Sequence, residues 1–244
     1  MNLPDAVENL YRVFASYPLR TDIPACSCCT TAEEITGLTS APLRKLGEEQ
    51  LDHFAFKATT TWGDLEDYKH FLPRILELAG EPGKSFELGF EMWIIAGKLK
   101  DNGWTGWPAP EREALGTWFM ALWEDILSRY RPGWDGHDDI DFLEHATGAI
   151  DDLSPFLDAW AARSDLPALL LLADFIVNRL GDAMRAKGGW QKISQREAIV
   201  RWFIDPARGE ALDAGIERHI DEPQAETLAT GLDFWRSMTG RTGG

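Results

Sequence analysis

Apolar side chains recur every three or four residues along almost the whole chain, which is the spacing of one face of an α-helix. Within residues 5–17, for example, Leu10, Val13 and Phe14 fall on a single helical face. No stretch shows the strict alternation of apolar and polar positions that is typical of a half-buried strand. The pattern therefore predicts an all-α protein.

Capping residues, prolines and glycines divide this pattern into about ten helices joined by short loops. Predicted helices span residues 5–17, 31–37, 48–60, 85–102, 110–130 and 166–186, and further helices start at residues 64, 138, 194, 206 and 222. The spacing of the starts is that of stacked helical hairpins, yet no sequence repeat is visible. An irregular multi-helix bundle and a short HEAT-like α-solenoid both fit. Because no change in composition marks a linker, we expect one all-helical domain over residues 1–244.

The stretch Leu166–Ala186 is apolar on nearly every side, so we expect it to be the central buried helix. Within it, Leu169–Val177 is predicted to be the most buried segment. Pro73 interrupts the predicted helix that starts at Asp64, and we expect a kink there or a fresh start near Phe71. The chain also has 11 Trp and 12 Phe, which predicts a large aromatic core.

Charge narrows the range of partners. The chain has 40 acidic and 24 basic residues, a formal net charge of −16. Such a field repels phosphate backbones and anionic membranes, so we expect neither nucleic-acid nor membrane binding. It favours a protein partner with a basic surface. Residues 1–10 lack a secretory pattern and the only Cys residues are clustered, so we expect a reducing, cytoplasmic location without disulfides.

The three cysteines are Cys26, Cys28 and Cys29. Cys26 and Cys29 have the CxxC spacing that can bind zinc, and a tetrahedral site would need two more ligands, for which His53 and His70 are available. A redox pair is a second interpretation. The third is a small buried turn in which Cys serves as a compact hydrophobe.

A second cluster lies in the segment TTWGDLEDYKHFLPRILEL, which begins at Thr60. Asp67, His70 and Arg74 are spaced i, i+3 and i+7 and share one helix face, where they could bind an anion or orient a proton donor. The alternative is a helix-start motif in which Asp64 caps the helix and Asp67 pairs with cations.

Together, the Cys cluster and this segment resemble a bacterial family of uncharacterised proteins over about residues 20–80. The resemblance implies no activity. It does imply that the two segments meet in space, which groups Cys26, Cys29 and His70 as a candidate metal site.

A third cluster contains His137, Asp141 and His145, which share a face if the helix extends back to His137. Histidine and carboxylate suit a divalent metal. The dipeptide His137–Asp138 is similar to the signature of HD-type metal phosphohydrolases, although the upstream His and downstream Asp of that family have no clear counterpart. The alternative is an acidic helix N-terminus that interacts with the helix dipole.

No phosphate-binding loop, GxSxG elbow or HExxH motif is present, and no catalytic set is complete. We therefore expect a non-catalytic acidic helical protein that binds a basic protein partner, for example an immunity-type antidote to a basic toxin. A metal-dependent hydrolase is the alternative. We expect no cofactor, with zinc as the alternative. The expected contacts are Asp138, Asp139, Asp141 and the loop rings of Trp104 and Trp107, and reversing the three aspartates should not unfold the chain.

Overall fold

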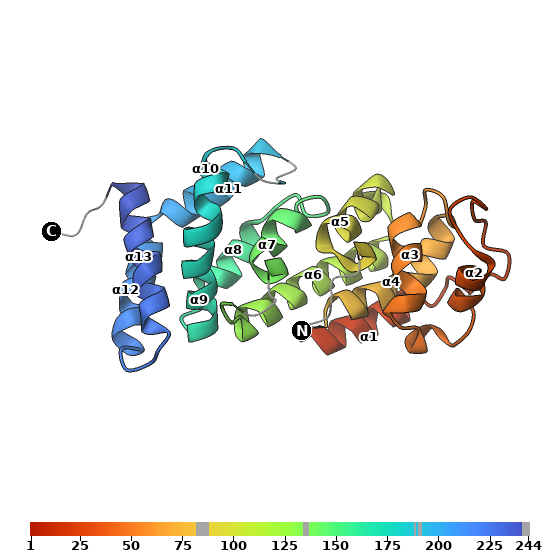
Figure 1. Ribbon diagram of the computed structural model, residues 1–244, viewed down its shortest axis with the longest axis horizontal. Helices are drawn as coiled ribbons and strands as arrows, with labels where there is room; N and C mark the ends of the chain where they lie inside the picture. Colours follow the sequence, from red (N-terminus) through yellow and green to blue (C-terminus); the bar gives the residue numbers. More distant parts are fainter. Residues whose placement is uncertain (82–87, 134–136, 188, 190–191, 241–244) are drawn as a thin grey trace. The chain divides into compact units, whose positions relative to one another are not determined.

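The computed structural model describes residues 1–81, 88–133, 137–187, 189 and 192–240, without the side chains of residues 88 and 137–140 (Figure 1). Most of these residues are helical. Within them there is no named β-strand, and the β pairing consists of isolated bridges from Ala25 and Ala58 to Trp62. The predicted all-α class is confirmed. None of the described helices combines the length and apolar character that a membrane span requires.

The chain divides into two compact units, Met1–Leu122 and Trp123–Gly244, and each is described by itself. The first unit contains α1 (Leu3–Phe14), α2 (Ala32–Leu38), α3 (Glu48–Lys57), α4 (Leu65–Ala79), α5 (Met92–Asp101) and the 3-10 helices η1 (Leu43–Lys45), η2 (Leu88–Phe90) and η3 (Trp104–Gly106). The boundary between the units falls within α6 (Ala109–Arg129).

Local signals set the starts of α2 and α4. Thr31 and Glu34 form the predicted capping box, in which each side chain accepts a hydrogen bond from the other residue's backbone N–H. Asp64 caps α4 by accepting from the backbone N–H groups of Glu66 and Asp67. Helix α4 then continues through Pro73 to Ala79, so the predicted fresh start near Phe71 is wrong. Proline has no backbone N–H, so Pro73 removes one hydrogen bond from the helix. Burial of Phe71, Leu72 and Pro73 outweighs this loss.

Aromatic rings fill the space between α3 and α4. The ring of Phe54 lies 4.7 Å from that of Phe71 and 5.5 Å from that of Trp62, edge to face in both cases. Helix α1 covers a neighbouring face of α4. This packing fixes α4, whose first turns carry Asp67, Lys69 and His70.

The second unit contains α7 (His137–Ala146), α8 (Ser154–Ala161), α9 (Leu166–Phe175), a π-helical segment η4 (Ile176–Leu180), α10 (Gly181–Met184), α11 (Ile193–Ile204), α12 (Pro206–Arg218) and α13 (Ala225–Thr239). All residues from Ala168 to Ala173 are buried, the longest such run among the described residues. The predicted segment Leu169–Val177 is therefore confirmed in most of its length, with Asp174 and Val177 only partly buried.

Helices α12 and α13 pack against each other and against α9, as Figure 1 shows in dark blue and teal. A close approach makes this possible: a Cβ added to Gly231 would lie 2.5 Å from the Cβ of Ala173. Around these helices, Phe175 stacks on Phe203 at 4.3 Å. The buried indoles of Trp160 and Trp235 each donate to a backbone carbonyl, so their polar atoms are satisfied.

Candidate functional site

The three cysteines converge in one turn of the first unit. The Sγ atom of Cys28 lies 2.8 Å from that of Cys26 and 3.3 Å from that of Cys29. All three Sγ atoms lie within 4.8 Å of one another, and all three cysteines are free. The turn is closed by the backbone N–H groups of Cys29 and Thr30, which both donate to the carbonyl of Cys26 at 3.0 Å.

Backbone hydrogen bonds hold this turn against the segment that precedes α4. The N–H of Cys26 donates to the carbonyl of Thr61 at 2.8 Å, and the N–H of Gly63 donates to the carbonyl of Pro24 at 2.7 Å. Gly63 has φ +67°, a conformation that glycine adopts without strain. The two segments of the resemblance therefore meet in space, through residues 24–26 and 61–63.

The thiols lie near the surface. Cys28 is exposed, and Cys26 and Cys29 are partly exposed, so the interpretation of the turn as a small buried hydrophobic cluster is wrong. A hydrogen bond from Cys28 lowers the pKa of the Cys26 thiol. The pKa of the Cys28 thiol is raised to about 11, mainly because its hydrogen bond to Cys26 favours the protonated form. Of Cys26 and Cys28, Cys26 is therefore the thiol favoured to ionise first.

The third member of this cluster is Cys28 and not His70. The Cys-x-Cys-Cys spacing contains the signal, but the CxxC interpretation passed over the middle thiol. His70 instead places Nδ1 2.8 Å from the backbone carbonyl of Tyr17. His53 places Nδ1 2.7 Å from a carboxylate oxygen of Glu34. Among the described residues, the group of converging metal-ligand atoms consists of the three thiols alone.

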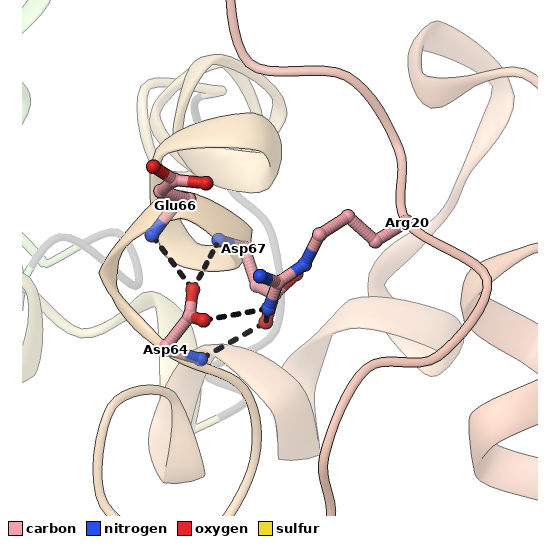
Figure 2. Close-up of polar contacts among 4 residues, drawn as sticks. All are labelled: Arg20, Asp64, Glu66 and Asp67. Atoms are coloured by element: carbon pink, nitrogen blue, oxygen red, sulfur yellow. Dashed lines mark hydrogen bonds and ion pairs between the residues drawn. The ribbon is translucent and has the colours of Figure 1, made fainter.

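The start of α4 forms an ion-pair cluster with Arg20. Figure 2 shows the guanidinium of Arg20 reaching from its loop to the carboxylates of Asp64 and Asp67. Its Nε and Nη2 atoms contact the two oxygens of Asp67 at 2.8 and 2.5 Å, and Nη2 contacts Asp64 at 2.7 Å. The side chain of Asp67 is only 1% exposed. Burial opposes ionisation of Asp64, but hydrogen bonds from the Asp67 backbone and from Arg20 outweigh it and lower the pKa of Asp64.

One turn further along α4, a buried charge cluster joins three elements of the first unit. The Nζ atom of Lys69 lies 2.6 Å from Glu111 on α6 and 3.1 Å from the hydroxyl of Tyr17. Tyr17 donates to the other carboxylate oxygen of Glu111 at 2.6 Å. The ammonium also lies over the ring of Trp107, 4.1 Å from its centroid. Partial burial and the hydrogen bond to Glu111 together raise the pKa of Tyr17.

These contacts favour the helix-start interpretation of the second sequence cluster. Asp67 is held by Arg20, and His70 by the carbonyl of Tyr17. Arg74 donates to the carbonyl of Leu46 at 2.8 Å and contacts Glu77 at 2.6 Å. This face of α4 thus binds other segments of its own chain. Sequence analysis did not identify Lys69 or Glu111, because Lys and Glu on amphipathic helices are usually exposed.

In the second unit, α7 begins at His137, so the predicted helical spacing with Asp141 and His145 is present. The carboxylate of Asp141, however, already has a partner within the chain. It pairs through both oxygens with Arg179 of η4, and the Asp141 side chain is 18% exposed. Asp141, expected as an exposed partner contact, is therefore paired within its own chain, and its reversal would break this pair. The side chains of Asp138 and Asp139 lie outside the described residues.

Trp104 and Trp107 differ in their surroundings. Trp104 lines an open pocket of about 310 Å³ together with Thr105, Ala109, Arg112 and Glu113. Trp107 is only 7% exposed, and its Nε1 donates to the carbonyl of Asn102 at 2.9 Å. The expected exposure of Trp107 is wrong, because its ring covers the ammonium of Lys69 and contacts Phe14.

Helix α12 presents a row of acids that sequence analysis did not single out. Glu210, Asp213 and Glu217 are spaced i, i+3 and i+7, and all three are exposed. Leu212 and Gly215 lie on the opposite, buried face. Asp213 has Arg236 at 3.5 Å, whereas Glu210 and Glu217 have no ion-pair partner in the described part of the chain. The row is therefore negatively charged and open to a partner.

Comparisons with known proteins found no matching family model, no matching curated protein and no matching solved structure. The resemblance of residues 20–80 consequently adds no activity.

Proposed function

We propose that this chain is an acidic helical binding protein whose partner is a protein with a basic surface. The observation that carries the proposal is the exposed row of Glu210, Asp213 and Glu217 on α12. Three carboxylates at this spacing project from one face of a rigid helix, and two of them have no cation beside them among the described residues. Such a row attracts a complementary set of Lys or Arg side chains.

The charge of the chain supports the same proposal. The first unit has 18 acidic and 11 basic residues, a net −7, and the second has 22 acidic and 13 basic residues, a net −9. Both units therefore attract a basic protein over about a Debye length, roughly 8 Å at physiological ionic strength. Acidic residues alone also serve solubility, so the arrangement on α12 matters more than the total charge.

Exposed apolar side chains also occur just after α12 and on α13, which packs against it. Ile220, just after α12, is 65% exposed, and Phe234 on α13 is also exposed. A contact surface commonly combines exposed apolar groups with a charged rim. The partner that fits is a basic protein with apolar side chains between its cations. A toxin with a cationic active site, blocked by an immunity-type antidote, belongs to this class.

Of the contacts expected from the sequence, Trp104 remains part of the proposal because it lines an open pocket. Trp107 is buried and is removed from it. Asp141 is removed because it is paired with Arg179. For the alternative, a metal-dependent hydrolase, the described residues show no group of three or more metal-ligand side chains that includes Asp141 or His145.

The proposal is tested by capture from an extract of the source organism on three immobilised proteins. The first is the wild type, and the second carries Glu210→Lys, Asp213→Lys and Glu217→Lys. The third is a matched control with Asp22→Lys, Asp158→Lys and Glu197→Lys, three exposed acids that are not on α12. Three reversals add six charges to −16, so both variants have a formal net charge of −10.

We expect the wild type and the matched control to retain the same basic protein, identified by mass spectrometry, and the α12 variant to lose it. Equal retention by all three proteins would remove the α12 row from the proposal. Equal loss of the captured protein in both variants would show that binding depends only on the net charge of the chain. Hydrolysis of a phosphate ester by the purified chain, abolished by His137→Ala, would favour the hydrolase instead.

A further inference from the structure

We propose that Cys26, Cys28 and Cys29 together bind one thiophilic metal ion of the zinc class, with one coordination position left for a ligand from outside the chain. The inference starts from the convergence of three sulfurs in four consecutive residues. Thiolate is the preferred ligand of zinc and of other soft ions. This metal site is independent of the proposed binding of a basic protein.

The three cysteines are free thiols, so their sulfurs are available as ligands. The two closest sulfurs are 2.8 Å apart, well beyond the roughly 2.05 Å of an S–S bond. Two thiolates on one tetrahedral zinc ion, each about 2.3 Å from the metal, lie roughly 3.8 Å apart. Metal binding would therefore require side-chain rotations that move the sulfurs apart to that spacing, and the exposed Cys28 is not enclosed by packing.

A role in packing does not explain the cluster. Free cysteine is among the most buried residue types when it acts as a small hydrophobe, whereas all three thiols here are exposed or partly exposed. The residue after Cys29, Thr30, is buried, and its Oγ1 has no hydrogen-bond partner among the described residues. Packing therefore explains neither the three thiols nor the unpartnered hydroxyl of Thr30.

Among the described residues, no His, Asp or Glu side chain is grouped with the three thiols to supply the remaining position. His53 and His70 are each held elsewhere, by Glu34 and by the carbonyl of Tyr17. A zinc ion with three protein ligands keeps a fourth position for water or an incoming group, whereas a purely structural site has four. The chemistry thus points to an exchangeable ion with access for a small donor such as water or a free thiol.

Binding must release protons, because the ligand is the thiolate. Each cysteine that coordinates loses its Sγ proton to solvent, so a fully formed site releases up to three protons per ion, less any thiol already ionised. No electron is transferred, and no bond within the protein forms or breaks. The loaded site, three thiolates on a divalent cation, has a net charge of −1.

The position of the three cysteines also determines how much metal binding would stabilise the folded chain. All three lie within residues 26–29, so the ion closes only a very short loop of chain. The turn is already held by the hydrogen bond from Cys26 to Thr61. A variant without thiols is therefore expected to fold, unlike a zinc finger, in which the metal joins distant segments.

The test uses the full reduced chain, titrated with Zn²⁺ against a chromophoric chelator and separately with Co²⁺. We expect one ion per chain, with sulfur-to-cobalt charge-transfer absorption and the strong visible bands of a tetrahedral ion. Each of Cys26→Ser, Cys28→Ser and Cys29→Ser should weaken Zn²⁺ binding by roughly tenfold or more, because each removes one of three ligands. His53→Gln and His70→Gln serve as controls and should bind as the wild type does.

A second measurement keeps the test decisive if a variant is unstable. In the wild type, one equivalent of Zn²⁺ should slow alkylation of all three thiols. Unchanged alkylation, or zinc retention equal to that of a Cys26→Ser/Cys28→Ser/Cys29→Ser variant, would overturn the proposal. Loss of binding in His70→Gln as large as in the cysteine variants would overturn the three-thiol assignment and favour a site that includes that histidine.

Discussion

The ammonium group of Lys69 lies 2.6 Å from the carboxylate of Glu111, and the two side chains are only 6% and 7% exposed. The residues are 42 positions apart, one on α4 and the other on α6. Tyr17 and the ring of Trp107 complete the surroundings of the ammonium. The pair therefore links three segments of the first unit through charges that water hardly reaches.

Removing one member of this pair should be costly. In Lys69→Met, the carboxylate of Glu111 stays buried without its cation, and we expect a loss of about 3–5 kcal/mol in the free energy of unfolding. The double variant Lys69→Met/Glu111→Leu should recover most of that loss, since no charge is then left buried. Urea unfolding of the three proteins checks this. A loss below about 1 kcal/mol in the single variant, as for an exposed pair, would contradict the burial argument.

The Arg20 cluster should make part of the stability depend on pH. Because the pKa of Asp64 is lowered in the folded chain, its contribution is present above its unfolded pKa of about 3.9 and is lost as the pH falls through the lower folded value. Arg20→Gln should thus reduce the free energy of unfolding at pH 7, and the difference from wild type should shrink at pH 3. Urea unfolding at both pH values measures it. A difference that does not change with pH would exclude the ion pair as its source.

Asp141 and Asp158 are predicted to respond differently to charge reversal. Asp141→Lys breaks the two-oxygen pair with Arg179, and hydrogen bonds to charged groups contribute roughly 1.5–3 kcal/mol each to stability. Asp158 is exposed on α8, so Asp158→Lys should change stability by less than about 0.5 kcal/mol. We expect Asp141→Lys to lower the thermal midpoint clearly and Asp158→Lys to leave it near the wild-type value. Equal midpoints would mean that the Arg179 pair does not contribute.

The contact between α13 and α9 depends on Gly231, which has no side chain. A Cβ at Gly231 would lie 2.5 Å from the Cβ of Ala173, so Gly231→Ala should force the helices apart and cost roughly 1–3 kcal/mol. Gly97 on α5 is the matched control, because nothing lies within 4 Å of its added Cβ. Gly97→Ala should be neutral or stabilising by up to about 1 kcal/mol, as alanine favours helix. Urea unfolding distinguishes them, and a neutral Gly231→Ala would contradict the close approach.

Local features of the fold could be predicted from the sequence because their signals are local. The capping box at Thr31 and Glu34 and the cap at Asp64 each lie within four residues of chain, and both are present. The buried run from Ala168 to Ala173 could be predicted because that helix has apolar side chains on every one of its faces. The continuity of α4 through Pro73 was not evident, because it depends on tertiary packing around the proline.

The candidate sites were harder to predict because they depend on distant contacts. Nothing near Lys69 in the sequence indicates that Glu111 neutralises it. Trp107 follows a glycine in a loop, which suggested exposure, yet its ring covers that ammonium. Cys28, in contrast, could have been included from its spacing to Cys26 and Cys29 alone. The row on α12 follows ordinary helical periodicity and became distinctive only once its opposite face was seen to be buried.

The measurement that most directly tests the central claim is the association rate constant for the captured partner as a function of ionic strength. It is made in parallel on the wild type, the α12 variant and the matched control with the same net charge. We expect the wild-type rate constant to fall by about tenfold or more from low to high salt, because added ions screen electrostatic steering. The control should follow the wild type closely, and the α12 variant should associate slowly with little dependence on salt. Identical rate constants and salt dependence for all three proteins would contradict the claim that the acids of α12 recognise a basic partner.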